Sequence, residues 1–178
     1  MIDHVFFLRH FKTQNNINNY LNGCSLYLPI SESKFLICDN SIDTLLCSPA
    51  LRCRQTINYI QFQGAKPQII YTEELLERNL GCMEGQLRNE MIHKYPHLFK
   101  DSKFIVFSDP PCGESYDNFR IRVMNFWEKC NQIYHGNILI CAHNQLLKML
   151  FFTINRELIT VDSWSKKTFP YGTIVKIK

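Results

Sequence analysis

The sequence predicts an α/β fold, a three-layer α/β/α architecture around a mainly parallel central sheet. Short runs of β-branched and aromatic residues alternate along the chain with segments of helical periodicity, an order typical of parallel sheets with helices on both faces. The chain has 178 residues, of which 46% are hydrophobic. This is enough for one compact domain and too little for two ordinary ones. We therefore expect a single domain over residues 1–178.

The first half of the chain contains three expected strands. They are short apolar runs over residues 4–8, 44–47 and 68–71. A helix is expected over residues 52–62, directly after the second strand. The Asn-rich stretch 15–22 is expected to form a loop. Residues 87–95 are expected to form a short helix that stops before Pro96, because a residue that precedes proline disfavours helical angles.

A long amphipathic helix dominates the second half. Ser115 follows a turn over residues 110–113 and can cap the helix, and Asp117 lies in its first turn, where an acid is favoured. Apolar residues then recur at helical spacing: Phe119, Val123, Phe126, Trp127 and Cys130. After Gly136 the sequence predicts a strand over residues 138–141, a helix over 145–152 and a closing strand over 172–177.

Polar side chains follow three of the predicted strands where each strand ends. Arg9 and His10 follow the first strand, Ser48 and Arg52 the second, and His143 the one over residues 138–141. In open parallel sheets, ligands bind at the carboxyl ends of the strands. Each signal is weak singly, since a strand end or a turn can be polar without a function. Together they predict an anion site built from two histidines and two arginines.

The charge balance favours a small anionic substrate over nucleic acid. Lys and Arg total 20 and Asp and Glu 16, so the net charge is +4, whereas nucleic-acid binders usually show a clustered basic face. No basic leader precedes the first apolar run, and no stretch is long enough to span a membrane. We expect a cytoplasmic protein that binds neither nucleic acid nor membranes; the sequence leaves the oligomeric state open.

The eight cysteines form no Cys-x-x-Cys pair, which disfavours a structural zinc site. Several lie inside apolar runs, where a free cysteine behaves as a small core residue. We expect them to be reduced and structural; a disulfide framework is the less favoured alternative.

Five segments of the chain resemble motifs of the histidine phosphatase superfamily, in the family's order. Residues 7–16, which contain Arg9-His10 and Asn16, resemble Arg-His-Gly-Glu-Thr-x-x-Asn. Residues 48–56 resemble Ser-Pro-Leu-x-Arg-Ala-x-Gln-Thr, and residues 75–85 resemble Leu-x-Glu-x-x-Phe-Gly-x-Trp-Glu-Gly. Residues 111–115 resemble Pro-Gly-Gly-Glu-Ser, and Ala142-His143 the late Ser/Ala-His-Gly block. The matches run nearly the length of the chain, which is far more specific than one short motif.

The resemblance implies a phosphoglycerate-mutase-like fold and a covalent mechanism. His10 would attack phosphorus and become phosphohistidine, with its other ring nitrogen donating to a backbone carbonyl. Arg9, Arg52 and His143 would bind the phosphoryl oxygens, and Asn16 and Asn144 would add substrate contacts. Glu77 would act as general acid and then base. No metal or cofactor is required, because the arginines supply the electrostatic stabilisation. The sequence leaves the direction of the Glu77 pKa shift open.

The resemblance also implies which neighbouring residues do not react. Arg54 and Glu84 are expected to be scaffold, since the family's catalytic arginine aligns with Arg52. We expect a small phosphorylated metabolite as substrate, as in the broad-specificity and α-ribazole-phosphatase-like branch. The sequence leaves the physiological substrate open among sugar phosphates, nucleotide-derived metabolites such as α-ribazole phosphate, and phosphoproteins.

Three residues depart from the family pattern. Phe11 and Lys12 replace the Gly and Glu after the nucleophilic histidine, and Asn144 replaces the Gly after the second histidine. Glycine at such positions permits close approach of the backbone or unusual angles, and asparagine tolerates left-handed angles better than most residues. We expect Phe11 to narrow the mouth of the pocket or to stack on the substrate.

Three alternatives remain open from the sequence. Cys82 and Arg88 have the Cys-x5-Arg spacing of cysteine phosphatases, although Cys82 follows no predicted strand. A non-catalytic phosphate-binding module could retain the fold, but such a module has no need of Glu77. A mutase would need a lid, and we expect only a short helix and a loop over residues 85–113 and no tail beyond the last strand. We therefore expect a phosphatase.

Overall fold

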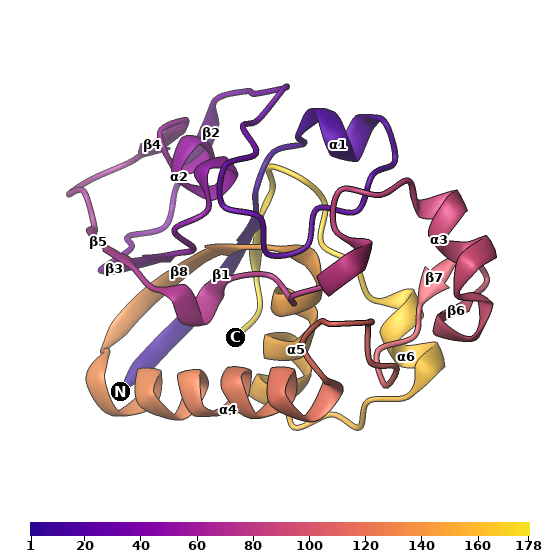
Figure 1. The fold of residues 1–178 in the computed structure, drawn as a ribbon. Coiled ribbons are helices and arrows are strands. Elements are labelled where there is room, and N and C mark those ends of the chain that lie inside the picture. Colours follow the sequence, from indigo (N-terminus) through magenta and orange to yellow (C-terminus); the bar gives the residue numbers. More distant parts are fainter.

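The computed structural model describes residues 1–178 and places five strands in one sheet. Their order is β5 (Gln68–Tyr71), β3 (Thr44–Cys47), β8 (Gly136–Ala142), β1 (Ile2–Arg9) and β9 (Ile174–Lys176). All neighbours pair in parallel except β9, which runs antiparallel to β1. The predicted α/β class with a mainly parallel sheet is therefore confirmed, and Figure 1 shows β1 and β8 at its centre.

Helices cover both faces of this sheet, as the sequence predicted. Helices α4 (Tyr116–Ile133) and α5 (Asn144–Asn155) pack on one face, and α2 (Leu51–Ile57) packs on the other. Alternate residues of β1 serve the two layers, because Val5 and Phe7 join the α4–α5 core while Phe6 and Leu8 join the α2 core. In Figure 1, α4 runs below the sheet and α2 lies above it.

The predicted helix over residues 52–62 is wrong in its second half. Helix α2 ends at Ile57, and the chain returns to an extended conformation in β4 (Ile60–Phe62). This strand pairs in parallel with β2 (Leu36–Cys38), which the sequence did not predict. The two strands form a small separate sheet. Isoleucine and phenylalanine fit a pleated, half-buried surface well, so pairing with β2 outweighs continuation of the helix.

The Asn-rich stretch is not entirely a loop. One helical turn, α1 (Gln14–Ile17), begins there, because the side chains of Thr13 and Asn16 cap it reciprocally. The helix before Pro96 is present as α3 (Arg88–Lys94), the last predicted helix extends to Asn155, and the closing strand is limited to β9.

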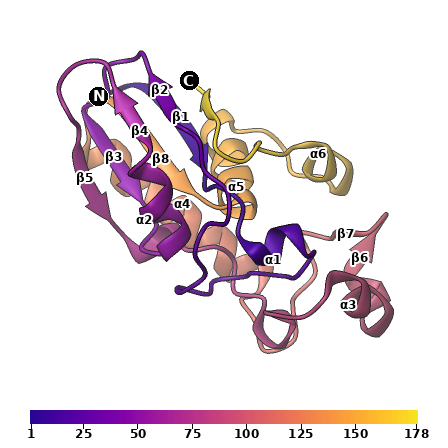
Figure 2. The same ribbon diagram turned by 90° about the horizontal axis from the view of Figure 1, so that it is seen from above.

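Residues 85–113 hold more structure than the helix and loop that the sequence predicted. After α3 the chain forms a hairpin of β6 (Phe99–Lys100) and β7 (Lys103–Phe104). A further short helix that the sequence missed, α6 (Val161–Lys166), lies beside this hairpin (Figures 1 and 2). Lys100 and Asp162 form an ion pair of 3.5 Å, and Lys103 Nζ donates to the Ser165 carbonyl at 3.0 Å. These contacts hold the hairpin against α6.

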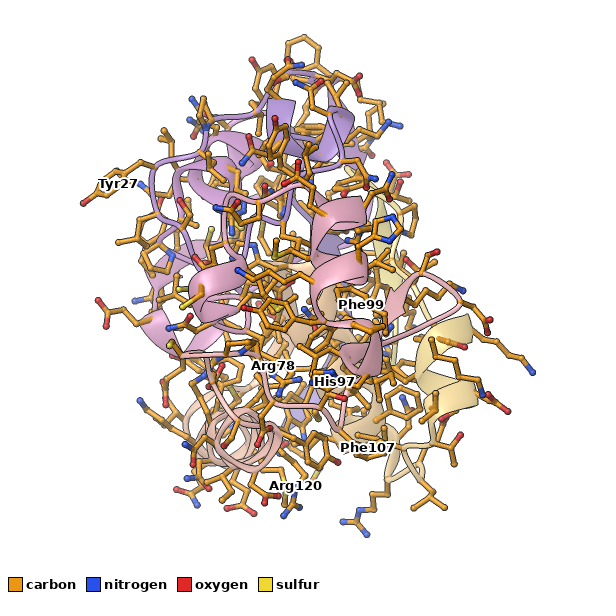
Figure 3. The ribbon with its side chains drawn as sticks, turned by 45° about the vertical axis from the view of Figure 1, so that its right-hand side comes forward. Tyr27, Arg78, His97, Phe99, Phe107 and Arg120 are labelled. Carbon is orange, nitrogen blue, oxygen red and sulfur yellow. The ribbon has the colours of Figure 1, made fainter.

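Arg78 fixes the segment that follows the hairpin. Its guanidinium is fully buried and donates to the carbonyls of Val106, Ser108 and Glu114 at 2.7–3.0 Å. The side chain lies in the interior between α4 and the residues around Phe99 (Figure 3). Because Glu77 directly precedes Arg78, these three bonds also anchor the loop that carries Glu77. No helix combines the length and the apolar character needed to cross a membrane.

Candidate active site

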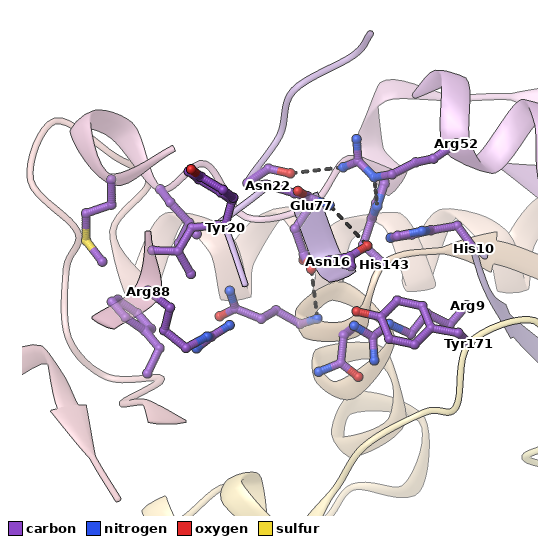
Figure 4. A pocket seen from close by; sticks show the side chains of 17 residues that line it. Arg9, His10, Asn16, Tyr20, Asn22, Arg52, Glu77, Arg88, His143 and Tyr171 are labelled. Atoms are coloured by element: carbon purple, nitrogen blue, oxygen red, sulfur yellow. Dashed lines mark hydrogen bonds between the residues drawn. The ribbon is translucent and has the colours of Figure 1, made fainter. Parts of the chain in front are cut away.

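A pocket of about 130 Å³ opens at the carboxyl ends of the parallel strands. The sequence predicted seven residues for this site, and all seven line the pocket: Arg9, His10, Asn16, Arg52, Glu77, His143 and Asn144. They come from segments far apart in the chain and converge on one space (Figure 4). The structure therefore brings together the seven side chains that the sequence assigned to the site.

His10 is held as a neutral imidazole with one nitrogen available. It follows β1 directly, and its backbone N–H donates to the Ala142 carbonyl at 3.1 Å. Its Nδ1 lies 2.5 Å from the carbonyl oxygen of Phe11, which can only accept, so Nδ1 carries the proton. Burial lowers the pKa of His10 well below its usual range, and the positive charge of Arg52 adds to this effect. Nε2 therefore keeps its lone pair at neutral pH, as a nucleophile requires.

Two arginines flank this histidine. The Arg9 guanidinium stacks on the Tyr171 ring with its central carbon 3.5 Å from the ring centroid, and it donates to the Phe169 carbonyl at 3.1 Å. Its Nε is buried without a partner. Arg52 is fully buried and donates to the carbonyls of Gly23 and Ser25. A guanidinium has five N–H donors, so each arginine retains donors for a bound anion.

His143 lies between Arg52 and Ser48. Its Nδ1 accepts from Arg52 Nε at 3.2 Å, and its Nε2 lies 2.9 Å from Ser48 Oγ. Since a guanidinium only donates, Nε2 carries the proton and donates to Ser48. Burial and the charge of Arg52 lower the pKa of His143 well below its usual range. The hydroxyl of Ser48 can also donate a hydrogen bond. If a bound anion replaces Arg52 at Nδ1, the proton can move to Nδ1 and face the anion, while Nε2 accepts from Ser48.

Glu77 faces the histidines across the pocket. Its Oε1 accepts from the backbone N–H groups of Leu146 and Arg78 at 3.0 and 3.1 Å, and its Oε2 from that of Gln145 at 3.1 Å. Removal from bulk water raises the pKa of Glu77, and these hydrogen bonds oppose the shift only in part. Oε2 accepts a single bond, so it is the oxygen with room for a proton.

The two asparagines have different surroundings. Asn16 Oδ1 accepts from Thr13 N and from Asn22 Nδ2 at 3.1 and 3.3 Å, which leaves the amide nitrogen of Asn16 for a ligand. Asn144 Oδ1 accepts from the backbone N–H of Phe169 at 3.2 Å. Asn144 is not among the residues with positive φ. Its backbone therefore needs no glycine, and its side chain holds the segment whose carbonyl binds Arg9.

The expectation that Phe11 narrows the pocket or stacks on substrate is wrong. Phe11 is only 4% exposed, belongs to the core between the sheet and α2, and lies edge-on to Tyr59. Gly172 packs against it so closely that a Cβ there would lie 2.1 Å from the ring, and Gly172 also has a φ of +54°. The bulky residue after His10 is thus accommodated by a glycine from the other end of the chain. Lys12 does not line the pocket.

Several lining residues were missed by sequence reasoning, among them Tyr20, Asn22, Arg88, Gln145 and Tyr171. Tyr171 lies 5.8 Å from His10 between ring centroids and supports Arg9. The sequence did contain a signal for Tyr171. A strand that runs antiparallel to its neighbours begins at the sheet edge where those neighbours end, so the residue before it lies near the site. Tyr171 immediately precedes the predicted last strand.

The residues expected to be scaffold lie outside the pocket. Glu84 accepts from the backbone N–H groups of Cys24 and Leu80, both at 2.9 Å, and Arg54 lies over the ring of Tyr71. Cys82 is exposed and does not line the pocket, so it cannot cooperate with Arg88 there. All eight cysteines are free thiols, and five of them are buried. No three His, Cys, Asp or Glu side chains lie close enough to hold a metal ion.

Comparison with known families gives the wider context of this pocket. The model of the histidine phosphatase superfamily (branch 1) matches residues 36–175. The chain belongs to this superfamily. The match begins beyond the His10 segment, in which Phe11 and Lys12 depart from the superfamily pattern, so the place of His10 in the site rests on its motif and on the geometry above.

Individual relatives of this histidine phosphatase superfamily member are distant in sequence. A protein of Schizosaccharomyces pombe named "probable phosphatase" is 25% identical over 160 residues, which cover 82% of this chain and 70% of the relative. The α-ribazole phosphatase of Shigella flexneri is 20% identical, with a TM-score of 0.76 over 98% of this chain and 89% of its own. A phosphoglycerate mutase of Thermus thermophilus is 21% identical, with a TM-score of 0.67 over 98% and 92%. These structures confirm the phosphoglycerate-mutase-like fold.

Proposed function

We propose that the protein hydrolyses phosphomonoesters of small metabolites through a phosphohistidine intermediate on His10. One observation carries the proposal. A neutral histidine with a free Nε2 faces a pocket that holds two arginines and a second histidine, and a carboxyl group with a raised pKa lies across from it. A site that only bound phosphate would gain from the arginines but has no use for a carboxyl group beside them. The names of the phosphatase relatives support the same reading.

The first step transfers the phosphoryl group to His10. Nε2 forms a bond to phosphorus as the bond from phosphorus to the ester oxygen breaks, and Glu77 donates its proton to the departing oxygen. In the second step Glu77 takes a proton from water, the water oxygen bonds to phosphorus, and His10 leaves as the neutral imidazole. The Nδ1–H···O=C bond to Phe11 keeps the ring in one orientation through both steps.

Hydrogen-bond donors around the pocket, including two guanidinium groups, stabilise the charge on the transferring group. Arg9 and Arg52 bind its equatorial oxygens, His143 joins them as a neutral donor once the anion replaces Arg52 at its Nδ1, and Asn16 adds an amide donor. Donors fixed before the reaction cost no reorganisation during it and supply most of the catalysis of phosphoryl transfer. Ser48, Tyr171 and Glu114 act as positioning residues. Ser48 forms a hydrogen bond with His143, and the Tyr171 ring supports Arg9. The backbone carbonyl of Glu114 accepts from Arg78, and its carboxylate accepts from Arg122 at 2.8 Å.

Hydrolysis of p-nitrophenyl phosphate is expected to proceed fully in EDTA and to be inhibited by vanadate. The arginines already provide the positive charge that a metal would supply, and vanadate mimics the five-coordinate transition state that they bind. Phosphate release is measured with and without EDTA, with Lys66→Gln, an exposed lysine between β4 and β5, as a control for charge change. Activity that EDTA abolishes and Mg²⁺ or Zn²⁺ restores would contradict this mechanism.

Incubation with 3-phosphoglycerate and its bisphosphate primer is expected to give free phosphate faster than isomerisation. A mutase must keep water from the phosphoenzyme while the substrate turns over. From residues 85–113 only Arg88, at the start of α3, and Phe104, at the end of the hairpin, line the pocket, which is too little to form such a lid. Both products are followed by NMR in one sample. Isomerisation much faster than release of phosphate would identify a mutase instead.

A further inference from the structure

A second cavity adjoins the active site. It has a volume of about 460 Å³ and shares four lining residues with the catalytic pocket: Arg88, Phe104, Asn144 and Gln145. Its walls are the β6–β7 hairpin, the first turns of α5, and α6 with the residues that follow it. The contacts between Lys103 and Ser165 and between Lys100 and Asp162 join the hairpin to α6. We call this space the lysine cavity.

The lining of the lysine cavity is strongly cationic. Its charged residues are Arg88, Lys103, Lys148, Lys166 and Lys167, and no Asp or Glu is among the twelve residues that line it. Only two of the twelve are hydrophobic, Phe104 and Trp164. A group of like charges in a concave site raises the local potential and attracts anions.

Lys148 distinguishes this cavity from an ordinary patch of surface lysines, because most of its side chain is buried. It lies on α5 and is only 6% exposed, and its ammonium group makes no hydrogen bond or ion pair. Nζ lies 4.3 Å from the centroid of the Trp164 ring, which offers only a cation–π contact. Burial lowers the pKa of Lys148 to about 8, although the charge of Glu77 opposes this shift. Nζ is not among the buried polar atoms that lack a partner, so it reaches the cavity, where no protein carboxylate pairs with it. A bound anion would supply that partner.

Gln145 adds a polar contact between the two spaces. It lines both, and its buried Oε1 has no partner. An amide oxygen can only accept, so it suits a hydroxyl group on the part of a substrate that joins the two sites.

We propose that the lysine cavity binds a second phosphate of the substrate, so that the enzyme acts on bisphosphorylated, hydroxylated small molecules. The proposal rests on the proposed function, since the phosphate to be hydrolysed lies at His10. The second phosphate then contacts Lys148 and Lys103, and the carbon skeleton passes Gln145.

The test compares bisphosphates with the corresponding monophosphates as competitive inhibitors of p-nitrophenyl phosphate hydrolysis. The pairs are fructose 1,6-bisphosphate with fructose 6-phosphate, ribulose 1,5-bisphosphate with ribulose 5-phosphate, and adenosine 3′,5′-bisphosphate with adenosine 5′-phosphate. At least one bisphosphate is expected to have a Ki about tenfold or more below that of its partner, because charge-assisted bonds to phosphate are strong. Lys148→Met should reduce this ratio to about one, Lys103→Gln should reduce it in part, and Lys66→Gln should leave it unchanged.

The outcomes separate this proposal from the one on which it rests. If no bisphosphate binds more tightly than its monophosphate, or if Lys148→Met weakens both members of a pair equally, the lysine cavity is not a phosphate subsite. Preferential hydrolysis of an acidic phosphopeptide would also overturn it. If the wild-type protein does not turn over p-nitrophenyl phosphate, the proposed function fails, and calorimetric titration with the same pairs still decides the subsite. Lys103→Gln, at an exposed position, serves where Lys148→Met does not fold.

Discussion

His10→Ala is expected to lower kcat for every phosphomonoester by roughly 10³-fold or more, because it removes the atom that forms the covalent intermediate. The Nδ1–H bond to Phe11 and the low pKa make His10 the neutral imidazole in the pocket with a nitrogen free of protein partners. The measurement is steady-state phosphate release, with His97→Ala as the matched control, since His97 is exposed on the turn after α3.

The same substitution is expected to abolish covalent labelling. Wild-type protein mixed with ³²P-labelled substrate and quenched in alkaline detergent should retain label that acid then releases, since phosphohistidine is stable in base and labile in acid. Peptide mapping should place this label on His10. Label on another residue, or wild-type rates in His10→Ala, would contradict the mechanism.

Glu77→Gln is expected to lower kcat by roughly 10²- to 10³-fold for alkyl phosphates and by much less for p-nitrophenyl phosphate. A poor leaving group needs a proton as the bond breaks, whereas nitrophenolate leaves without one. The single oxygen of glutamine can replace Oε1 and accept from the N–H groups of Leu146 and Arg78, so the fold should be retained, although the N–H of Gln145 loses its acceptor. Thermal unfolding checks this, and Glu73→Gln on the exposed neighbouring turn serves as control. Equal losses for both substrates would exclude Glu77 as the acid.

The pH profile gives an independent test of the same residue. Glu77 must be protonated for the first step, and its pKa is raised, so kcat/KM for an alkyl phosphate should fall as pH rises through that pKa. His10 must be neutral, and its pKa is lowered, so the acid limb should lie well below the usual range of histidine. Glu77→Gln should lose the alkaline limb and keep the acid one. A profile unchanged in shape would assign that limb to another group.

Much of the site could be predicted because it lies where regular elements end. Arg9, His10 and His143 follow apolar strands whose parallel arrangement is itself predictable, so their convergence follows from topology. Arg88 and the lysines of the lysine cavity could not be found in this way. Lys103, Lys166 and Lys167 are brought to the site by the β6–β7 hairpin and by α6, elements too short to have a clear periodicity. Arg88 and Lys148 lie on the predicted helices α3 and α5, but no motif of the histidine phosphatase superfamily marks them. Phe11 was misjudged for a related reason, since only the packing of Gly172 shows where its ring lies.

The bonds from Gln145 and Leu146 to Glu77 have a consequence for the energetics of the catalytic cycle. These two amides belong to the first turn of α5, where the aligned peptide dipoles create a partial positive charge. In the proposed mechanism, Glu77 gives its proton to the leaving group and the new carboxylate forms against that positive end, so the helix would favour the phosphoenzyme side of the first step. When the carboxylate regains a proton from water, the end of α5 loses its anionic partner. The helix end is thus most tightly held while the protein carries the phosphoryl group, and amide exchange at the start of α5 should slow in that state.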